Sequence, residues 1–112
     1  MKILTIGISK RNQNEINEFF SALNNEIIFT TTSFEAIKIL NRENIDVAII
    51  EFNFFDDLSL LKYLNQNFSH IKVILTTTDN TKDFLNIIKD SNYKIIKKPF
   101  RLSELRKEIF EK

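Results

Sequence analysis

The sequence of 112 residues contains no cysteine, one glycine (Gly7) and one proline (Pro99). The absence of cysteine excludes disulfides, thiolate zinc sites and a cysteine nucleophile. It is also consistent with a reducing compartment, and we expect the protein to be cytoplasmic.

Long apolar runs are missing as well. The apolar runs, such as residues 47–50 and 73–75, are far shorter than the about 20 residues that a membrane helix needs. The N-terminus turns polar by Ser9 and lacks the long apolar stretch and cleavage site of a signal peptide. The formal net charge is +1, so bulk attraction to nucleic acid or to an anionic membrane is not expected.

What remains is an ordinary globular composition, with 43% hydrophobic and 28% charged residues. No internal repeat, low-complexity tract or linker occurs, and the length suits a single core. We therefore predict one domain over residues 1–112.

Short β-branched runs alternate along the chain with stretches whose apolar residues recur at helical spacing. The strand-like runs are residues 2–8, 26–32, 45–52, 71–77 and 93–97. The helix-like stretches are residues 16–23, 36–40, 60–68, 84–88 and 102–110. Ser33 is predicted to cap the second helix.

Strict alternation of strands and helices predicts a parallel sheet that is covered on both faces. For a chain of this length, we expect the α/β flavodoxin-like fold, a doubly wound five-stranded sheet of order 2-1-3-4-5 with five helices. Its functional crevice lies at the carboxyl ends of the strands, where the strand order reverses. The residues expected there are 7–9, 51–57, 76–79 and 97–100.

At those strand ends the chain resembles the receiver domain of two-component response regulators. The strongest match is Lys98-Pro99-Phe100, which is similar to the Lys-Pro-Phe that closes the fifth strand of the family. Thr77 falls on the family's hydroxyl position after an apolar fourth strand, and Thr78 on the small residue that follows. The third strand also resembles the family's phosphoacceptor strand, but Glu51 stands where the family has an aspartate.

Other positions depart from the family. The two acidic residues that hold Mg²⁺ in the family are replaced by Gly7 and Ile8. The loop after the acceptor position reads Phe-Asp-Asp-Leu-Ser over residues 55–59, instead of the family's Pro-Asp-x-x-Gly. Ile95 stands in place of the aromatic switch residue.

These departures all affect Mg²⁺ binding and phosphoryl transfer. Mg²⁺ needs several hard oxygen ligands in near-octahedral geometry, and phosphoryl transfer depends on that metal and on a lysine. Without the acidic pair, Glu51 is the one carboxylate left among these positions. Its additional methylene places the carboxylate further from the backbone than that of an aspartate. We therefore expect loss of Mg²⁺ binding, no catalytic residues and no efficient phosphotransfer.

Glu51 has two interpretations. It is either a fixed substitute for a phosphoaspartate beside Lys98, or a strand-end carboxylate held in a salt bridge by Lys98 or Lys97. Thr77 is similarly either a switch hydroxyl, as the resemblance implies, or an ordinary strand-end residue. Two adjacent aromatics in the crevice, Phe54 and Phe55, either plug the vacant metal pocket or form a contact patch.

The remaining polar groups are expected to have simpler roles. Asp56 and Asp57 are interpreted as loop residues, with Asp57 available to cap the third helix. His70 is interpreted as a surface turn residue. A basic cluster near the fifth strand lies close to the face that binds partners in the family; it comprises Lys94, Lys97, Lys98 and Arg101.

The resemblance and its departures thus imply a pseudo-receiver, a phosphorylation-independent signalling module that binds a histidine kinase-related protein or a downstream effector. The face expected to bind comprises the fourth helix, the fifth strand and the fifth helix. Two alternatives stay open: the N-terminal regulatory part of a longer DNA-binding regulator, which alone would bring contact with nucleic acid, and a small-ligand binder that uses the same crevice. Against the second, the loop after the first strand has no phosphate-binding glycine pattern.

Overall fold

Strands and helices alternate along the chain in the computed structural model, as the pattern predicts. The structure describes residues 1–21, 25–51, 57–77, 93–98 and 100–110. The strands are β1 (Lys2–Ile6), β2 (Glu26–Thr30), β3 (Val47–Glu51), β4 (Lys72–Thr77) and β5 (Lys94–Lys97). The helices are α1 (Lys10–Ser21), α2 (Ser33–Arg42), α3 (Asp57–Asn67) and α5 (Leu102–Phe110).

All five strands are parallel and form one sheet of order β2-β1-β3-β4-β5. This confirms the predicted flavodoxin-like sheet. Four of the five predicted helices are present in the described residues, and the one predicted over residues 84–88 lies outside them. The strand order reverses between β1 and β3, so the carboxyl ends of these two strands bound the crevice.

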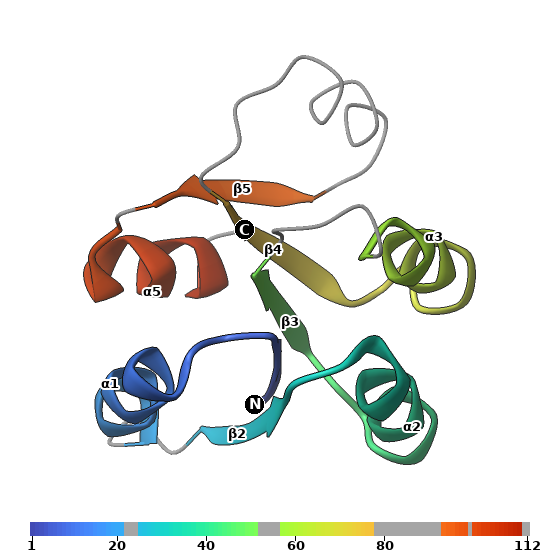
Figure 1. Cartoon of the computed structure of the whole chain (residues 1–112), viewed down its shortest axis with the longest axis horizontal. Helices are drawn as coiled ribbons and strands as arrows, with labels where there is room; N and C mark the ends of the chain where they lie inside the picture. Colours follow the sequence, from blue (N-terminus) through green and yellow to red (C-terminus); the bar gives the residue numbers. More distant parts are fainter. Residues whose placement is uncertain (22–24, 52–56, 78–92, 99, 111–112) are drawn as a thin grey trace.

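The helices cover both faces of the sheet, with α1 and α5 on one side and α2 and α3 on the other (Figure 1). Alternate residues of each strand point to opposite faces, so each strand contributes to both cores. The α1/α5 core contains Ile3, Ile8, Ile16, Phe20, Val47, Ile49, Ile74, Ile96, Leu105 and Ile109. The α2/α3 core includes Leu4, Ile6, Ala36, Leu40, Ala48, Ile50, Leu60, Leu64, Val73 and Leu75. Each fully buried valine, leucine, isoleucine or phenylalanine contributes about 1.5–3 kcal/mol.

The N-cap of α2 is Thr32 and not Ser33, so the prediction for this helix start was wrong by one residue. Thr32 has extended backbone angles, and its hydroxyl accepts the Glu35 N–H at 3.1 Å. Ser33 is already the first helical residue. Both residues carry a hydroxyl, and only the position where the backbone turns into the helix distinguishes them.

The helical spacing of Leu102, Leu105, Ile109 and Phe110 predicts that all four point inward, but Phe110 is 44% exposed, so the prediction was wrong for this residue. It is the last residue of α5, and its ring lies 6.4 Å from the ring of Phe20 on α1. His70, by contrast, is exposed after α3, as predicted. Within the described ranges, no helix has the length and apolar character to cross a membrane.

Charged side chains pair at the amino ends of the strands, opposite the crevice. Lys2 Nζ lies 2.7 Å from Glu43 Oε2 and 3.7 Å from Glu26 Oε2. The hydrogen bond between Lys2 and Glu43 raises the pKa of the lysine and lowers the pKa of the carboxyl group. An open depression of about 520 Å³ lies here, lined by Met1, Lys2, Glu26, Asn44 and Asp46. It is therefore not part of the crevice at the carboxyl ends.

Candidate functional site

Glu51 and Lys98 form an ion pair at the carboxyl ends of the strands. Glu51 is the last residue of β3, and Lys98 directly follows β5. Because β4 lies between these two strands, the pair connects strands that are not neighbours in the sheet. The exposed fractions of the two side chains are only 9% for Glu51 and 22% for Lys98.

The alternation of side chains along the strands explains why Lys98, and not Lys97, is the partner. Glu51 follows Ile49 at a spacing of two and therefore lies on the α1/α5 face of the sheet. Lys98 follows Ile96, which belongs to the same core, so it reaches the same face. Lys97 projects to the other side and is exposed.

Burial affects the charge of Lys98 directly. Removal from water disfavours the ammonium form and lowers the pKa of Lys98 from its usual value. The Glu51 carboxylate opposes this effect, because a nearby negative charge favours the protonated amine. The ion pair with Glu51 therefore offsets the cost of burying the Lys98 ammonium group.

Thr77 lies beside this pair as the last residue of β4. The Thr77 carbonyl accepts a hydrogen bond of 2.9 Å from the Lys98 backbone N–H, and Thr77 is 1% exposed. The preceding residue, Thr76, is the register partner of Glu51 and is also 1% exposed. Glu51, Thr77 and Lys98 therefore stand at the ends of three adjacent strands. By the same alternation, however, Thr77 follows Leu75 onto the α2/α3 face. Thr76 follows Ile74 and shares the face of the ion pair.

Gly7 lies next to Glu51 and has a backbone conformation that favours glycine. Its φ angle is +76°, and its N–H donates to the Thr30 carbonyl at 3.0 Å. A Cβ atom at this position would lie 3.7 Å from the Glu51 carbonyl oxygen, which is ordinary contact. Space is therefore available, and the positive φ angle is what selects glycine.

Replacing Gly7 by alanine should destabilise the fold by about 1–2 kcal/mol. An L-residue at positive φ brings its Cβ too close to the carbonyl oxygen that follows it in the same chain, even where the surroundings leave space. Gly7→Asn should cost less, since asparagine tolerates this region better. Urea unfolding of the two variants and the wild-type chain measures both effects. Equal stability of all three proteins would contradict the argument from φ.

Ile8, the second position of the missing acidic pair, belongs to the α1/α5 core. Only 6% of it is exposed, and it packs in the cluster that contains Ile16 and Phe20. The Ile8 carbonyl accepts a hydrogen bond of 2.9 Å from Gln13 Nε2, which joins it to α1. Sequence reasoning identified the lost acid but missed this core role, although the apolar run from β1 to residue 8 was a signal for it.

The described residues offer little to a metal ion. No group of three or more histidine, aspartate or glutamate side chains gathers among them, and the crevice carboxylate Glu51 is paired with Lys98. Asp56 lies outside the described residues, and the structure describes only the backbone of Asp57, the first residue of α3. Other residues of the sequence predictions also lie outside the described residues; they are Phe54, Phe55, Thr78 and Pro99.

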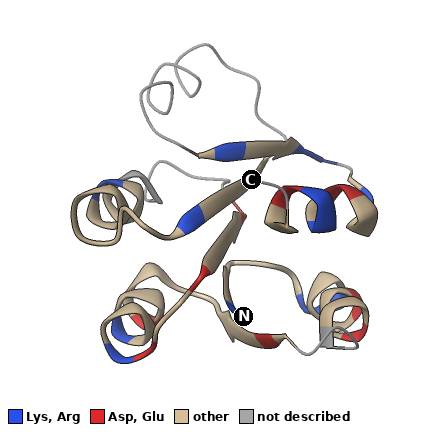
Figure 2. Cartoon of the chain, turned by 180° about the vertical axis from the view of Figure 1, so that it is seen from behind, with Lys and Arg blue, Asp and Glu red and all other residues tan. Residues whose placement is uncertain are grey.

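The predicted partner-binding face is described over β5 and α5, while residues 84–88 lie outside the described part. Lysines occupy the first and last residues of β5, as Figure 2 shows. Lys94, Ile95 and Lys97 are all exposed, with Ile95 exposed by 38%. The position that matches the family's aromatic switch residue is thus held by an exposed aliphatic side chain. Lys97 shares its side of β5, while Lys94 points to the other side.

No protein-family model matches the sequence, and no curated protein matches it at a significant level. Solved structures do match. The signal receiver domain of an HD domain-containing protein from Pseudomonas fluorescens has a TM-score of 0.84 at 19% identity, covering 96% of this chain and 90% of that one. A two-component response regulator from Clostridium difficile has a TM-score of 0.83 at 22% identity, covering 97% and 94%.

The receiver domain of a Francisella response regulator gives a TM-score of 0.81 at 25% identity, with coverage of 96% of this chain and 92% of that one. These similarities extend over nearly the whole of both chains, and the low identities explain why the sequence comparisons found nothing. The fold of this chain is that of a response regulator receiver domain.

Proposed function

We propose that this chain is a non-catalytic signalling module of receiver type that acts without phosphorylation. The observation that carries the proposal is the ion pair between Glu51 and Lys98. In the family, the lysine contacts the phosphoryl group on the acceptor aspartate. Here a carboxylate one methylene longer supplies a permanent negative charge to the lysine, so the state of the pair does not depend on a phosphate donor.

The surroundings of Glu51 support the same reading. A carboxylate that accepts a phosphoryl group must be free to attack, and the transferred charge is normally neutralised by a metal and a lysine. Glu51 is 9% exposed and already engaged with Lys98. On the β1 side, Gly7 and the buried Ile8 supply no carboxylate for Mg²⁺.

The output of such a module is contact with another protein. The face we infer for it comprises the fourth helix, the fifth strand and the fifth helix, of which Lys94, Ile95 and Lys97 are exposed in the described part. An apolar side chain beside a lysine, as Ile95 is beside Lys97, suits a partner that offers an apolar contact next to a carboxylate. A histidine kinase-related protein or a downstream effector is the expected kind of partner.

Incubation with acetyl phosphate and Mg²⁺, followed by intact-mass measurement, tests the proposal. We expect no gain of a phosphoryl group, while a receiver domain with an intact acceptor aspartate and acidic pair, treated in parallel, gains one. A phosphoryl adduct on this chain that disappears in Glu51→Gln would overturn the proposal, because Glu51 would then be an acceptor and not a fixed charge.

A further inference from the structure

The two edges of the sheet are formed by β2 and β5. Helices α1 and α2 flank β2 on the two faces, and no described helix or strand lies beyond it (Figure 1). An edge strand exposes backbone N–H and C=O groups that pair readily with another strand. Whether β2 pairs in this way depends on which of its backbone groups face outward and on how its side chains protect the edge.

The hydrogen bonds of β2 show which backbone groups face outward. The Glu26 N–H donates to the Met1 carbonyl, and the Thr30 carbonyl accepts from the Gly7 N–H, both at 3.0 Å. Backbone groups of successive strand residues point in alternating directions, so Glu26, residue 28 and Thr30 face β1. The N–H and C=O groups of Ile27 and Phe29 therefore face the open edge.

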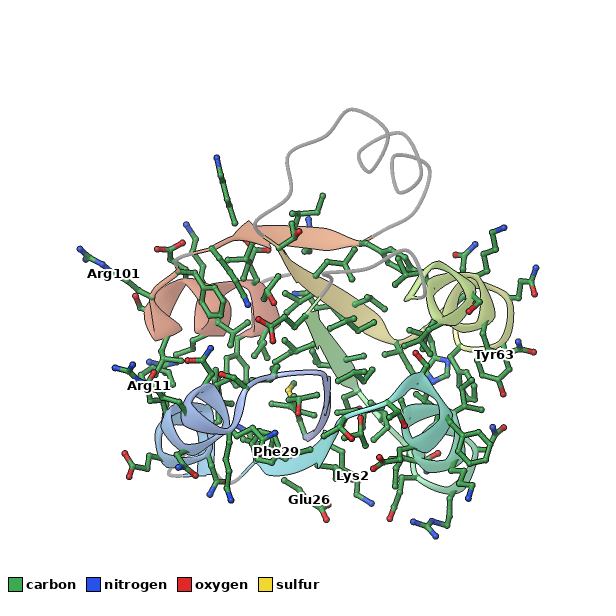
Figure 3. All side chains as sticks on the ribbon, in the orientation of Figure 1. Lys2, Arg11, Glu26, Phe29, Tyr63 and Arg101 are labelled. Atoms are coloured by element: carbon green, nitrogen blue, oxygen red, sulfur yellow. The ribbon has the colours of Figure 1, made fainter. Side chains whose placement is uncertain are left out.

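The side chains of β2 are also incompletely covered. Ile27, Ile28 and Phe29 are each partly exposed, whereas Ile3 and Leu4 in β1 are completely buried. Figure 3 shows Glu26 pointing outward at this margin of the molecule. Three consecutive apolar side chains thus remain partly accessible along a strand whose outer backbone is open.

Natural proteins often protect an edge strand with lysine, proline or a bulge. The β5 edge has lysines at both of its ends, Lys94 and Lys97. The β2 strand reads Glu-Ile-Ile-Phe-Thr and contains neither lysine nor proline, and its register with β1 is regular over all five residues. Among the described residues, β2 therefore lacks the lysines that stand at both ends of β5, and its one charged side chain is Glu26 at its first position.

We propose that β2 pairs antiparallel with β2 of a second copy of this chain, which joins the two sheets into one. With Ile28 at the two-fold axis, Ile27 of one copy lies opposite Phe29 of the other, and each such pair exchanges two hydrogen bonds through outward-facing groups. The same register places Glu26 opposite Thr30 of the second copy, so no like charges meet. Aromatic and β-branched residues in opposite positions also favour pairing.

Charge distinguishes this pairing from the equivalent one at β5. On β5 the outward-facing backbone groups belong to Ile95 and Lys97, since the Lys98 N–H faces β4. In the same register, β5 would bring the exposed Lys94 and Lys97 of both copies into the interface. Like charges gathered there oppose association, whereas the β2 register brings no like charges together. A second copy therefore suits β2 better than β5.

Sedimentation velocity of the whole chain over a range of concentrations tests this proposal. We expect a concentration-dependent dimer whose dissociation constant rises by about tenfold or more in Ile27→Pro, because symmetry removes two intermolecular hydrogen bonds. Ile27→Pro leaves the bonds between β1 and β2 intact, since the Ile27 N–H does not face β1. The matched control is Ile95→Pro, which removes an outward-facing donor on β5 and should leave the dimer unchanged.

Amide hydrogen exchange on the wild-type chain provides a test that does not depend on the folding of a variant. The Ile27 and Phe29 amides should be protected in the dimer and lose protection on dilution, while the Glu26 amide stays protected at all concentrations. A chain that remains monomeric at millimolar concentration would overturn the proposal. So would a dimer in which the Ile27 and Phe29 amides exchange freely, since another surface would then form it.

Discussion

Replacing Ile8 by aspartate, which restores one acid of the family's metal pocket, should destabilise the domain by at least about 3–5 kcal/mol at neutral pH. Ile8 is 6% exposed in an apolar core, so the new carboxylate would lose its hydration without gaining a described cationic partner. The loss of the isoleucine side chain adds a cavity cost. Because domains of this kind are stable by about 5–15 kcal/mol, part of the population should unfold.

Chemical denaturation over a range of pH measures this effect and separates its causes. Burial raises the pKa of the introduced carboxyl group, so its ionisation cost should diminish as the pH falls toward the ordinary aspartate value of about 3.9. The cavity cost should persist at all pH values and is measured independently in Ile8→Ala. Ser9→Asp, at the exposed neighbouring position, is the matched control and should have little effect.

Magnesium ions should not restore the stability of Ile8→Asp, because one added carboxylate does not complete a ligand set. A variant that folds like the wild type and is stabilised by millimolar Mg²⁺ would contradict this argument. In that case a single substitution would restore Mg²⁺ binding, and the burial of residue 8 would not explain why the acidic residue is missing.

Replacing Lys98 by methionine should destabilise the domain by about 2–4 kcal/mol, because it leaves the Glu51 carboxylate unpaired in a site where it is 9% exposed. The estimate lies below the cost for a fully buried pair, since Lys98 retains 22% exposure. Methionine preserves most of the apolar length of the side chain, so the loss reports mainly on the charge.

A double-mutant cycle distinguishes the ion pair from packing. Adding Glu51→Gln to Lys98→Met removes the unpaired charge and should recover about 1–3 kcal/mol relative to the sum of the two single substitutions. The unfolding free energies of the four proteins in urea provide the measurement. If the two single effects simply add, the two side chains do not interact in solution, and the permanent pair that supports the proposed function is absent.

The architecture could be predicted from the sequence because the alternation of apolar runs is a local signal. Residues 45–52 are apolar on consecutive positions apart from Asp46 and Glu51, as a strand covered on both faces should be, and residues 71–77 contain the apolar run 73–75. The observed strands β3 and β4 lie within these runs, and the observed sheet order is the predicted one. Strand and helix ends were less well predicted, because Thr32 and Ser33 satisfy the same capping rule and only the backbone conformation separates them.

The pairing within the crevice could be predicted only in part. Glu51 was expected to meet Lys98 or Lys97, and adjacent residues of a strand point to opposite faces. Which lysine shares the face of Glu51 depends on the register of β5 beside β4 and on the core that receives Ile96. Register is a relation between segments far apart in the chain, so no pattern within one segment determines it.

By itself, the sequence therefore determined the strand–helix alternation and the absence of acidic residues at positions 7 and 8, since both follow from residue types in local order. The sheet order was predicted from that alternation and the chain length through the general rules for doubly wound sheets. Only the tertiary structure showed which roles the residues at those two positions have. Gly7 occupies a turn with positive φ beside Glu51, and Ile8 belongs to the core beneath α1. The conformation of Gly7 and the burial of Ile8 both depend on contacts between strands and helices that are distant in sequence. Such contacts exist only once the whole domain is packed.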